Sequence, residues 1–513
     1  MDTTLVSALR DVLGRDTGEP VELVETHISW VLLTATLAYK LKKPVRLPFL
    51  DFTSLEARRH FCEEELRLNR RFAPSLYLDV VPVRGSSESP RLAGPGEPID
   101  YLVRMRRFPA PSLLRDLLGA GRIEPAQLDS FGRRMAAWQE AAPRVTPPSA
   151  YASPGAIVRA ATDLLAALRA QPTPISPHDE DRLAALGDWL RQQAGALHMA
   201  WISRQQGGAV RECHGDLHTG NVVLLDGELT PFDCVEFDPA LRWIDVMSDV
   251  AFLTMDPPGP RPARPRLSLP GRVAAAQRRC DGAAVAALLR GVPGVGAGRG
   301  VGPGAAFRIR AGLPGVCRTA PPEGGARLLI THGLSGSGKS SIAQQLLGAA
   351  GAVRVRSDVE RKRLFGLDPL ERSAARGLDI YSEEATRRTF QRLRDCARGS
   401  LLAGYPVIVD AAFLRREERR SFEALAADLH VPFTILDCRA ALATLHRRVA
   451  ERAAAGGDAS EAGPEVLVRQ IDRQEKLEAG ERARAIEVLT DDTVDVARLA
   501  ERWLAVTIPT GRG

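Results

Sequence analysis

Apolar residues follow two different patterns in the first half of the chain. Val21–Thr26 and Ser29–Leu41 alternate or run continuously apolar, which predicts strands. Leu55–Phe72 is apolar on one side and charged on the other, which predicts a helix. Further strands are expected at Leu76–Val83 and Tyr101–Met105, and further helices at 111–142, 155–170 and 178–205. Residues 1–255 are therefore predicted to form one mixed α/β domain.

From Ala326 onward, apolar strands alternate with helices. The expected strands are Arg327–Thr331, Val353–Arg356, Val407–Val409 and Phe433–Leu436. The expected helices are Ser340–Leu347, a stretch around 383–403 and the arginine-rich stretches that follow. Strands that alternate with helices form parallel sheets covered on both faces, so residues 326–513 are predicted to form a second domain of this kind.

Residues 256–325 have a different composition. Fourteen glycines and eleven prolines occupy these 70 positions, lysine is absent, and no helical or strand period persists. A flexible Gly/Pro linker is one interpretation. A frameshifted stretch of GC-rich coding sequence is the other, because out-of-frame GC-rich codons yield this mixture of Arg, Gly, Pro and Ala. Sequencing this part of the gene distinguishes the two.

The formal net charge of +6 is concentrated in that same segment. Residues 256–325 hold 11 arginines and three acidic residues, a surplus of eight, so the rest of the chain sums to −2. A nucleic-acid-binding domain needs a basic face, and the aromatic residues that stack on bases are only 5% of this chain. We therefore expect no nucleic-acid partner. The oligomeric state is not determined by the sequence.

The overall composition, 44% hydrophobic and 26% charged, is that of a soluble globular protein of two or three domains. No run of about 18 apolar residues occurs, so no membrane span is expected. The seven cysteines lie far apart without a CxxC pair, and Met1–Asp16 lacks a signal-peptide pattern. These features predict a cytoplasmic protein with reduced thiols and no zinc site.

A phosphate-binding pattern lies between the first strand and the first helix of the C-terminal domain. Glycines allow a tight loop whose backbone N–H groups point at a phosphate chain from a helix N-terminus. Lys339 would neutralise the β- and γ-phosphates, and the Ser340 hydroxyl would ligate Mg²⁺. The residues expected to bind nucleotide are Gly333, Ser335, Gly336, Ser337, Gly338, Lys339, Ser340 and Ser341. The sequence thus predicts an ATP site with Mg²⁺ as a cofactor.

Charged residues near the strand ends of this domain are candidates for catalysis. Asp410 ends an apolar strand, where its carboxylate would reach the metal; a strand-end or helix-capping role is the alternative. Asp358 follows the second strand, and it either accepts a proton from a substrate hydroxyl or caps a helix. Arg448 and Arg452 share one predicted helix. They either stabilise the transferring phosphoryl group from a mobile lid or face solvent.

Three runs in this domain, RSDVERKRLFG, VIVDAAFLRREER and RRVAERAAAGGDASEA, resemble P-loop small-molecule kinases related to gluconate kinase and zeta-toxin-type kinases. They are most similar to the predicted kinases fused behind an aminoglycoside-phosphotransferase-like domain. The resemblance covers about residues 326–505. It implies ATP-dependent phosphorylation of a small hydroxyl compound, with Asp358 near the acceptor and Arg447–Arg452 in a lid.

A second phosphoryl-transfer pattern, HGDLHTGN at residues 214–221, precedes an apolar strand in the N-terminal domain. Kinase-like transfer needs a carboxylate to orient the acceptor hydroxyl, plus an Asn and an Asp to hold Mg²⁺. Asp216 has the type and position of the catalytic carboxylate, and Asn221 and Asp233 those of the metal ligands. His214 and His218 lack a third metal ligand at a sensible spacing, so His214 is expected to brace the loop.

These residues resemble the aminoglycoside phosphotransferase and choline kinase branch of protein-kinase-like folds. The runs that match the domain found fused to P-loop kinases are THISWVLLTATLAYKLKKPV, CEEELRLNRRFAPSLYLDVVPV and DCVEFDPALRWIDVMSDVAFL. The resemblance implies that Lys42, or Lys40 on the same strand face, holds the α- and β-phosphates and pairs with Glu65. A surface salt bridge is the alternative for these residues. It also implies a hinge strand at Tyr101–Met105 and bracing residues at Asp245 and Asp249.

These patterns predict two kinase-type domains that each use Mg-ATP, with a small hydroxylated molecule as the acceptor. Two departures concern the N-terminal half. No glycine-rich loop lies between its first strands, and the ordered helices that relatives carry after the AFLTMD motif are replaced by the 256–325 stretch. The alternative is an ATPase or a nucleotide-binding regulatory protein whose N-terminal kinase-like half is inactive.

Overall fold

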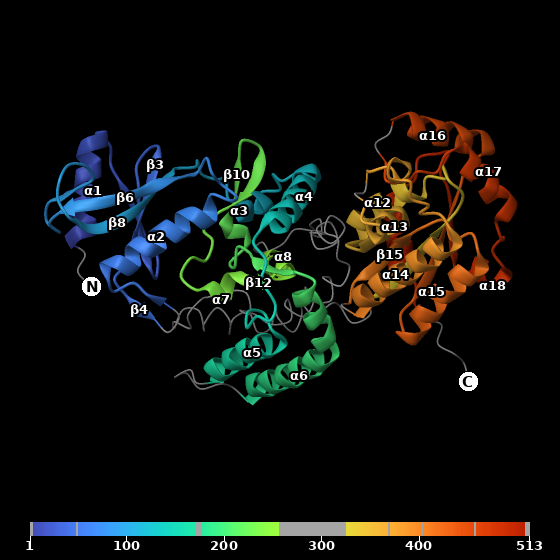
Figure 1. The fold of residues 1–513 in the computed structure, drawn as a ribbon, viewed down its shortest axis with the longest axis horizontal. Coiled ribbons are helices and arrows are strands. Elements are labelled where there is room, and N and C mark those ends of the chain that lie inside the picture. Colours follow the sequence, from blue (N-terminus) through green and yellow to red (C-terminus); the bar gives the residue numbers. More distant parts are fainter. Residues whose placement is uncertain are drawn as a thin grey trace. The chain divides into compact units, whose positions relative to one another are not determined.

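The computed structural model describes residues 4–47, 50–169, 177–255, 325–367, 370–402, 404–455 and 458–507. These residues belong to two compact units, an N-terminal unit up to residue 255 and a C-terminal unit from residue 325 (Figure 1). The linker and frameshift hypotheses concern residues 256–325, of which all but residue 325 lie outside the described residues. The glycine pair at 456–457 of the predicted lid also lies outside them.

A six-stranded antiparallel sheet forms the first part of the N-terminal unit, in the order β1-β2-β3-β8-β6-β7. Its strands are β1 Glu22–Glu25, β2 Ser29–Leu33, β3 Leu37–Lys42, β6 Tyr77–Gly85, β7 Pro90–Arg91 and β8 Pro98–Arg106. The two-residue strands β4 (Arg46–Leu47) and β5 (Leu50–Asp51) pair beside it. The single strand expected at Ser29–Leu41 is instead two strands, because a turn at 34–36 reverses the chain.

Helices α1 (Thr4–Thr17) and α2 (Leu55–Asn69) belong to this sheet layer. The buried side of α1 packs into the sheet's apolar core with Trp30, Leu41 and Leu102. Ser54 caps α2 by accepting a hydrogen bond from the Ala57 N–H at 3.0 Å. The helix expected at Leu55–Phe72 is therefore confirmed, whereas α1 was not predicted.

The second part of the N-terminal unit is mostly helical. Its helices are α3 Leu114–Gly119, α4 Pro125–Ala141, α5 Pro154–Arg169, α6 Pro177–Gln206, η1 Thr219–Asn221, α7 Pro239–Arg242 and α8 Val246–Met255. The helix expected at 111–142 is interrupted at 120–124, just before Pro125 begins α4. The segment that begins with the HGD pattern, residues 214–221, is called the HGD loop below. Two small antiparallel strand pairs flank it. They are β9 (Val210–Glu212) with β12 (Trp243–Asp245), and β10 (Val222–Leu225) with β11 (Glu228–Pro231).

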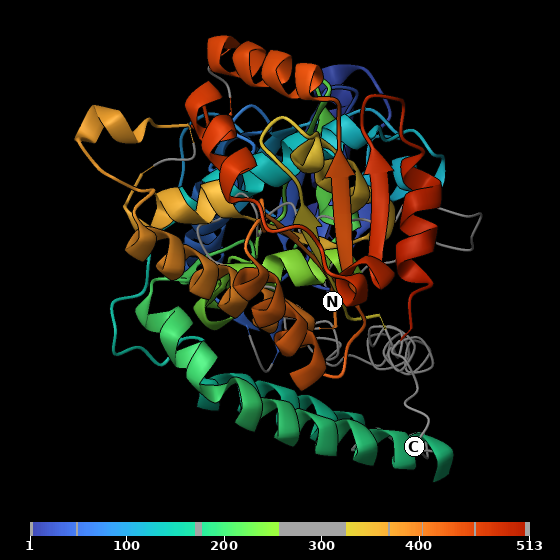
Figure 2. The ribbon, with the colours of Figure 1, turned by 90° about the vertical axis from the view of Figure 1, so that its right-hand side faces the viewer.

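The C-terminal unit has the parallel sheet that the sequence predicts. Five strands lie in the order β14-β15-β13-β16-β17 and run the same way (Figure 2). They are β13 Arg327–His332, β14 Val353–Arg356, β15 Pro406–Asp410, β16 Phe433–Arg439 and β17 Ala485–Leu489. Every residue of β13 is buried, so both faces of the sheet are covered.

Nine helical elements accompany this sheet among the described residues. They are α12 Lys339–Ala350, α13 Ser357–Leu364, η2 Ser373–Arg376, α14 Glu383–Leu402, α15 Arg416–Asp428, α16 Leu442–Ala455, α17 Pro464–Arg473, α18 Ala479–Ala483 and α19 Val496–Leu504. Leu346 of α12 and Trp503 of α19 share one core with strand residues Leu329 and Leu436. The strands β14 and β15 therefore end on the same edge as the loop that begins α12.

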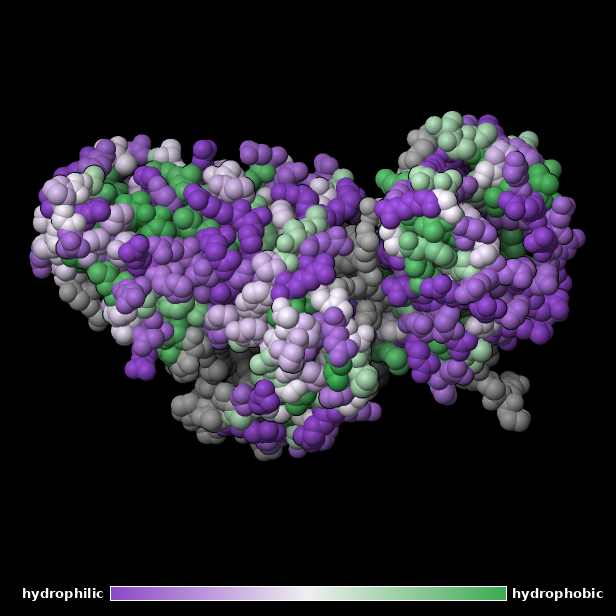
Figure 3. Space-filling model, viewed as in Figure 1, coloured by the Kyte–Doolittle hydropathy of each residue, from purple (hydrophilic) through white to green (hydrophobic). Residues whose placement is uncertain are grey.

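The surface and the cysteines of the described residues bear on two expectations, the absence of a membrane span and reduced thiols. Figure 3 shows hydrophilic residues over most of the visible face. No helix in the described part of the chain is long and apolar enough to cross a membrane. Cys62, Cys213, Cys234 and Cys438 are free thiols.

Candidate active sites

The loop between β13 and α12 has a shape that only glycine allows. Gly333, Gly336 and Gly338 adopt φ values of +141°, +86° and +75°. A Cβ atom on Gly333 would lie 2.4 Å from the Cys438 carbonyl oxygen. A Cβ on Gly336 would lie 2.7 Å from the Leu445 carbonyl oxygen. The loop thus packs too closely against β16 and α16 for side chains at these two positions, which explains why both are glycine.

The residues that follow this loop bring the groups for phosphate and metal together. The ammonium of the half-buried Lys339 donates to the Leu334 carbonyl at 3.1 Å. Burial lowers the pKa of Lys339, and the carboxylates of Asp410 and Asp358 oppose that shift. The Ser340 hydroxyl lies 3.1 Å from Asp410 Oδ1. A hydroxyl and a carboxylate at that separation fit Mg²⁺, which prefers oxygen ligands.

Asp410 is the last residue of β15 and is almost fully buried. Burial opposes its ionisation, but Arg354 and Arg356 outweigh burial and hold its pKa below the usual value. Arg354 Nε donates to Asp410 Oδ2 at 3.1 Å, and Arg356 Nε lies 3.9 Å from the same oxygen. The sequence did not predict that either arginine contacts Asp410, since nothing in the spacing along β14 shows that they face the end of β15.

Asp358 lies in the first turn of α13, whose N-cap position is Arg356. The alternative that Asp358 caps this helix is therefore wrong. Its carboxylate lies 3.7 Å from Arg356 Nη2, and Arg356 also donates to Asp458 at 2.6 Å. The side chain of Asp358 is 23% exposed, so a substrate can reach it.

The arginines of α16 separate into different environments. Arg447 is exposed and pairs with Glu451 at 3.1 Å, so it faces solvent. Arg448 donates to Thr490 Oγ1 at 3.0 Å, to the Thr490 carbonyl at 2.6 Å and to the Gly336 carbonyl at 3.3 Å. Arg452 donates to the Ala462 carbonyl at 2.8 Å and is close enough to Lys339 to lower its pKa. Arg452 thus lies nearer the transfer centre, while Arg448 holds the phosphate loop.

Two contacts on the phosphate loop were not predicted from the sequence. Gln470 of α17 accepts a hydrogen bond from the Ser335 N–H at 2.8 Å. Thr490 Oγ1 donates to the Ser337 carbonyl at 3.0 Å. Of the loop residues expected to bind nucleotide, Ser335 and Ser337 are buried, whereas Ser341 is exposed. Only the fold places Gln470 and Thr490 on the loop, because both are distant in sequence.

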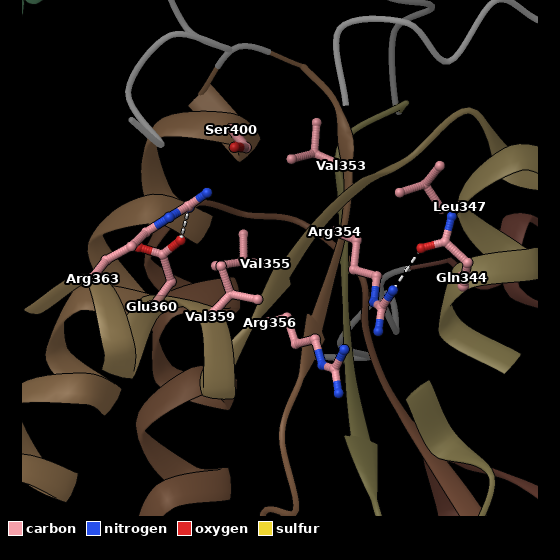
Figure 4. Close-up of a pocket in the computed structure, with 10 residues that line it drawn as sticks. All are labelled: Gln344, Leu347, Val353, Arg354, Val355, Arg356, Val359, Glu360, Arg363 and Ser400. Carbon is pink, nitrogen blue, oxygen red and sulfur yellow. Dashed lines mark hydrogen bonds and ion pairs between the residues drawn. The ribbon is translucent and has the colours of Figure 1, made fainter. Parts of the chain in front are cut away.

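A pocket of about 160 Å³ lies along the edge strand β14 (Figure 4). Valines from β14 and α13 line it, and Glu360 and Arg363 of α13 form an ion pair at one side. Gln344 of α12 accepts a hydrogen bond from Arg354 at 2.7 Å. Arg354 also binds Asp410, so the pocket lies next to the candidate metal ligands. Neither Ser340 nor Asp410 lines it.

The HGD loop of the N-terminal unit is braced from two sides. Asp249 accepts hydrogen bonds from the His214 N–H at 2.8 Å and the Gly215 N–H at 2.9 Å, as the resemblance implies. His214 Nε2 donates to the Phe232 carbonyl at 2.8 Å. Burial lowers the pKa of His214 to about 4, so its ring is neutral at pH 7. Asp245 instead binds Arg204 through two contacts of 2.6 Å, which ties α6 to the end of β12.

The predicted catalytic and metal residues of this unit lie in adjoining positions. Asn221 Nδ2 donates to the Asp216 carbonyl at 3.0 Å and lies 3.4 Å from the Asp216 carboxylate. Phe232, the residue before Asp233, donates its N–H to the Asn221 carbonyl at 3.0 Å. Asp233 adopts a left-handed φ of +64°, which is uncommon for a non-glycine residue. The structure therefore brings Asp216, Asn221 and Asp233 to one loop cluster.

Both candidate lysines of β3 contact Glu65, but only one is accessible. Lys42 is fully buried, lies 2.7 Å from Glu65 and also pairs with Glu236. Lys40 lies 2.8 Å from Glu65 and 2.7 Å from Asp233, whose side chain is 44% exposed. Burial opposes the charge on Lys42, but Glu236 and Glu65 outweigh it and raise its pKa. The alternative of a surface salt bridge is wrong for the contacts of both lysines with Glu65, because the Glu65 side chain is fully buried.

The Asp249→Asn substitution should reveal a pH-dependent stability difference. Burial raises the pKa of Asp249 to about 6, although its two backbone N–H donors oppose this. When folding raises the pKa of a carboxyl group, that group stabilises the folded protein fully at pH values below its unfolded pKa. This stabilisation is lost as the pH rises through the folded pKa. Relative to Asp249→Asn, the wild type should gain about 2 kcal/mol between pH 7 and pH 4. Urea unfolding across this range measures it, and a constant difference would contradict the raised pKa.

The comparisons with known proteins place a family model on the C-terminal unit. Residues 328–477 match the model described as AAA domain. This range contains the phosphate loop, Asp358, Asp410 and the arginines of α16. The C-terminal unit, with its glycine loop on a parallel sheet, is thus similar to the AAA domain family over these residues.

Solved structures and curated relatives are also similar to this chain. A gluconokinase from Sinorhizobium meliloti 1021 is 18% identical over 35% of this chain and 93% of its own, with a TM-score of 0.28. The APS kinase CysC of Mycobacterium tuberculosis, solved with AMPPNP and APS, is 23% identical over 34% and 94%, with a TM-score of 0.25. Uncharacterized proteins of Mycobacterium tuberculosis and Mycobacterium bovis are 28% identical over 474 residues, 89% of this chain and 91% of theirs. The chain thus spans nearly the whole length of these relatives.

Proposed function

We propose that the P-loop kinase-like domain transfers the γ-phosphoryl group of ATP to a hydroxyl group of a small molecule. The observation that carries this proposal is the meeting of Ser340 and Asp410, 3.1 Å apart, beside the half-buried Lys339 and the glycine loop. A Cβ atom at Gly333 or Gly336 would clash with the backbone carbonyl of Cys438 or Leu445, so the tight loop depends on both glycines. The donor set and the cradle both fit Mg-ATP.

The residues of this domain would act mainly by positioning and by electrostatic stabilisation. Loop N–H groups and Lys339 hold the phosphate chain, and Arg452 faces the charge that develops on the transferring group. Asp358, at the partly open edge of the sheet, orients the acceptor hydroxyl and takes its proton. Mg²⁺ bound to Ser340 and Asp410 would supply charge neutralisation at the phosphates.

For the N-terminal unit we propose a protein-kinase-like, aminoglycoside-phosphotransferase-like nucleotide site. Lys40 is the better candidate for holding the phosphates than Lys42, because Lys40 contacts the half-exposed Asp233 while Lys42 is enclosed by two carboxylates. Glu65 would orient Lys40, and Asp216 would orient an acceptor hydroxyl. Asn221 and Asp233 would hold Mg²⁺, since both project from the braced loop cluster.

A second candidate function is a nucleotide-binding regulatory protein or ATPase with an inactive N-terminal half. The direct Lys40–Asp233 ion pair favours it, because that pair occupies the two groups that a nucleotide and its metal need. For both candidate functions we propose a cytoplasmic location and no nucleic-acid or membrane partner.

Calorimetric titration of the whole protein with ATP and Mg²⁺ tests the number of sites. Lys339→Ala removes the ammonium of the phosphate loop, so the expected result is two sites in the wild type and one in the variant. The matched control Lys476→Ala changes a lysine of the same domain outside the loop and should keep both sites.

One site in the wild type and none in Lys339→Ala would support the second candidate. An unchanged stoichiometry in Lys339→Ala would contradict nucleotide binding at the phosphate loop. Turnover of ATP that no added hydroxyl compound accelerates would contradict phosphotransfer and favour an ATPase.

A further inference from the structure

The pocket beside β14 follows an open edge of the C-terminal sheet. Among the strands of the described residues, β14 pairs with β15 alone, so the other side of β14 has no strand neighbour. Successive side chains of a strand point to opposite faces of its sheet. All four residues of β14 line the pocket, and Arg354 bonds to Gln344 of α12 on one face. The pocket therefore runs along the strand edge, between α12 on one face and α13 and α14 on the other.

The middle of this pocket is apolar. Its apolar lining residues are Leu347, Val353, Val355 and Val359. Figure 4 shows the three valines between the ion pair of α13 and the contact of Arg354 with Gln344. The volume of about 160 Å³ is close to that of a cavity of about 150 Å³ that holds one benzene molecule. A small aliphatic molecule therefore fits the pocket.

A buried hydroxyl group in the pocket lining has no hydrogen-bond partner. Ser400 of α14 lines the pocket and is fully buried. No group of the described residues forms a hydrogen bond with its Oγ atom. Buried polar groups in folded proteins nearly always have such a partner. The Ser400 hydroxyl can therefore donate a hydrogen bond to an oxygen atom of a ligand.

The charges of the lining favour an anionic ligand over a cationic one. Arg354, Arg356 and Arg363 line the pocket, whereas Glu360 is the one acidic residue among the described lining residues. Each of these arginines already contacts a carboxylate, so the folded protein does not depend on a bound anion. An ammonium group would nevertheless meet three cations and one anion. A carboxylate instead brings only acceptors, which match the unpartnered hydroxyl of Ser400.

We propose that this pocket binds a small aliphatic carboxylate of about four to six carbon atoms. Its chain packs against the valines of β14 and α13, and its carboxylate accepts a hydrogen bond from Ser400. The site is distinct from the nucleotide and acceptor sites, because none of Lys339, Asp358 and Asp410 lines it. Binding here is independent of the proposed phosphotransfer.

Methyl NMR of the full-length protein tests this site directly. The valine methyl groups are labelled, and isovalerate is titrated into the protein. We expect the signals of Val353, Val355 and Val359 to shift with a common Kd on the order of 1 mM, as for other ligands of so few atoms. Isoamyl alcohol and isoamylamine have a similar branched chain and are the neutral and cationic comparisons. Each should bind about tenfold more weakly than isovalerate.

The Ser400→Ala substitution tests the hydrogen bond to the carboxylate. It removes a hydroxyl that has no partner among the described residues, so the protein should keep its stability while the Kd for isovalerate rises about tenfold. Thr434→Val is the matched control, because the Thr434 hydroxyl is also buried without a partner in the described part of the chain but does not line the pocket. The control should keep the wild-type Kd. Thermal unfolding measures the stability of both variants.

The outcomes separate this inference from the proposed function. Valine methyl signals that do not respond to isovalerate would overturn the site itself. An equal Kd in Ser400→Ala and the wild type, or tighter binding of the alcohol or the amine, would contradict the carboxylate assigned to it. Loss of isovalerate binding in saturating Mg-ATP would place the carboxylate in the nucleotide site and would also overturn the inference. Failure of Mg-ATP itself to bind would overturn the proposed function alone.

Discussion

An alanine at position 333 should abolish ATP binding by the C-terminal domain. Its Cβ atom would lie 2.4 Å from the Cys438 carbonyl oxygen and 2.7 Å from Ser337 Oγ, so the loop backbone and β16 would have to move apart. The φ of +141° adds about 1–3 kcal/mol of backbone strain for any residue with a side chain. The loop should therefore open and lose the N–H groups that converge on the phosphates. Calorimetry with Mg-ATP measures the loss.

The Gly377→Ala substitution is the matched control for Gly333→Ala. Gly377 also has a positive φ, of +63°, but a Cβ atom there would meet no atom within 4 Å. It should cost about 1–2 kcal/mol of stability and leave ATP affinity unchanged. Equal ATP affinity in Gly333→Ala and the wild type would contradict the role assigned to the loop.

The two lysines of β3 should respond in opposite ways to replacement by methionine. Lys42→Met leaves Glu65 and Glu236 buried without the cation between them, so the N-terminal unit should lose about 3–5 kcal/mol of unfolding free energy. Lys40→Met should cost much less, because Glu65 keeps Lys42 and Asp233 is half exposed. Its expected effect is instead the loss of ATP binding at the N-terminal site.

Urea unfolding and calorimetry of both variants measure these two effects. Lys43→Met serves as a control on the same strand end, since Lys43 pairs with the exposed Glu25 and not with Glu65. A stable Lys42→Met that no longer binds ATP, together with an unstable Lys40→Met, would reverse the assignment of the two lysines.

Much of the C-terminal domain could be predicted from the sequence because its signals are local. The glycine spacing of the phosphate loop needs only a strand before it and a helix after it, and both are present. Asp410 was found for the same reason, since it ends an apolar strand. The parallel sheet followed from the alternation of strands and helices.

The contacts that complete the sites could not be predicted, because they join distant parts of the chain. Arg354 alternates with valines on a short edge strand and gives no sign that it reaches Asp410. Gln470 occupies an ordinary position on an amphipathic helix. Lys40 and Lys42 were correctly expected on one strand face, but only the fold shows which carboxylates enclose each of them.

The position of Thr490 on the phosphate loop has a consequence for synthesis of the chain. Thr490 closes against Ser337 across a separation of 153 residues, at the end of the last strand of the sheet. During translation the glycine loop and α12 leave the ribosome long before this closing residue does. Contacts between residues so far apart in the sequence form late in folding. A nascent chain should therefore lack nucleotide affinity until β17 has docked, and ATP would then stabilise only the finished domain.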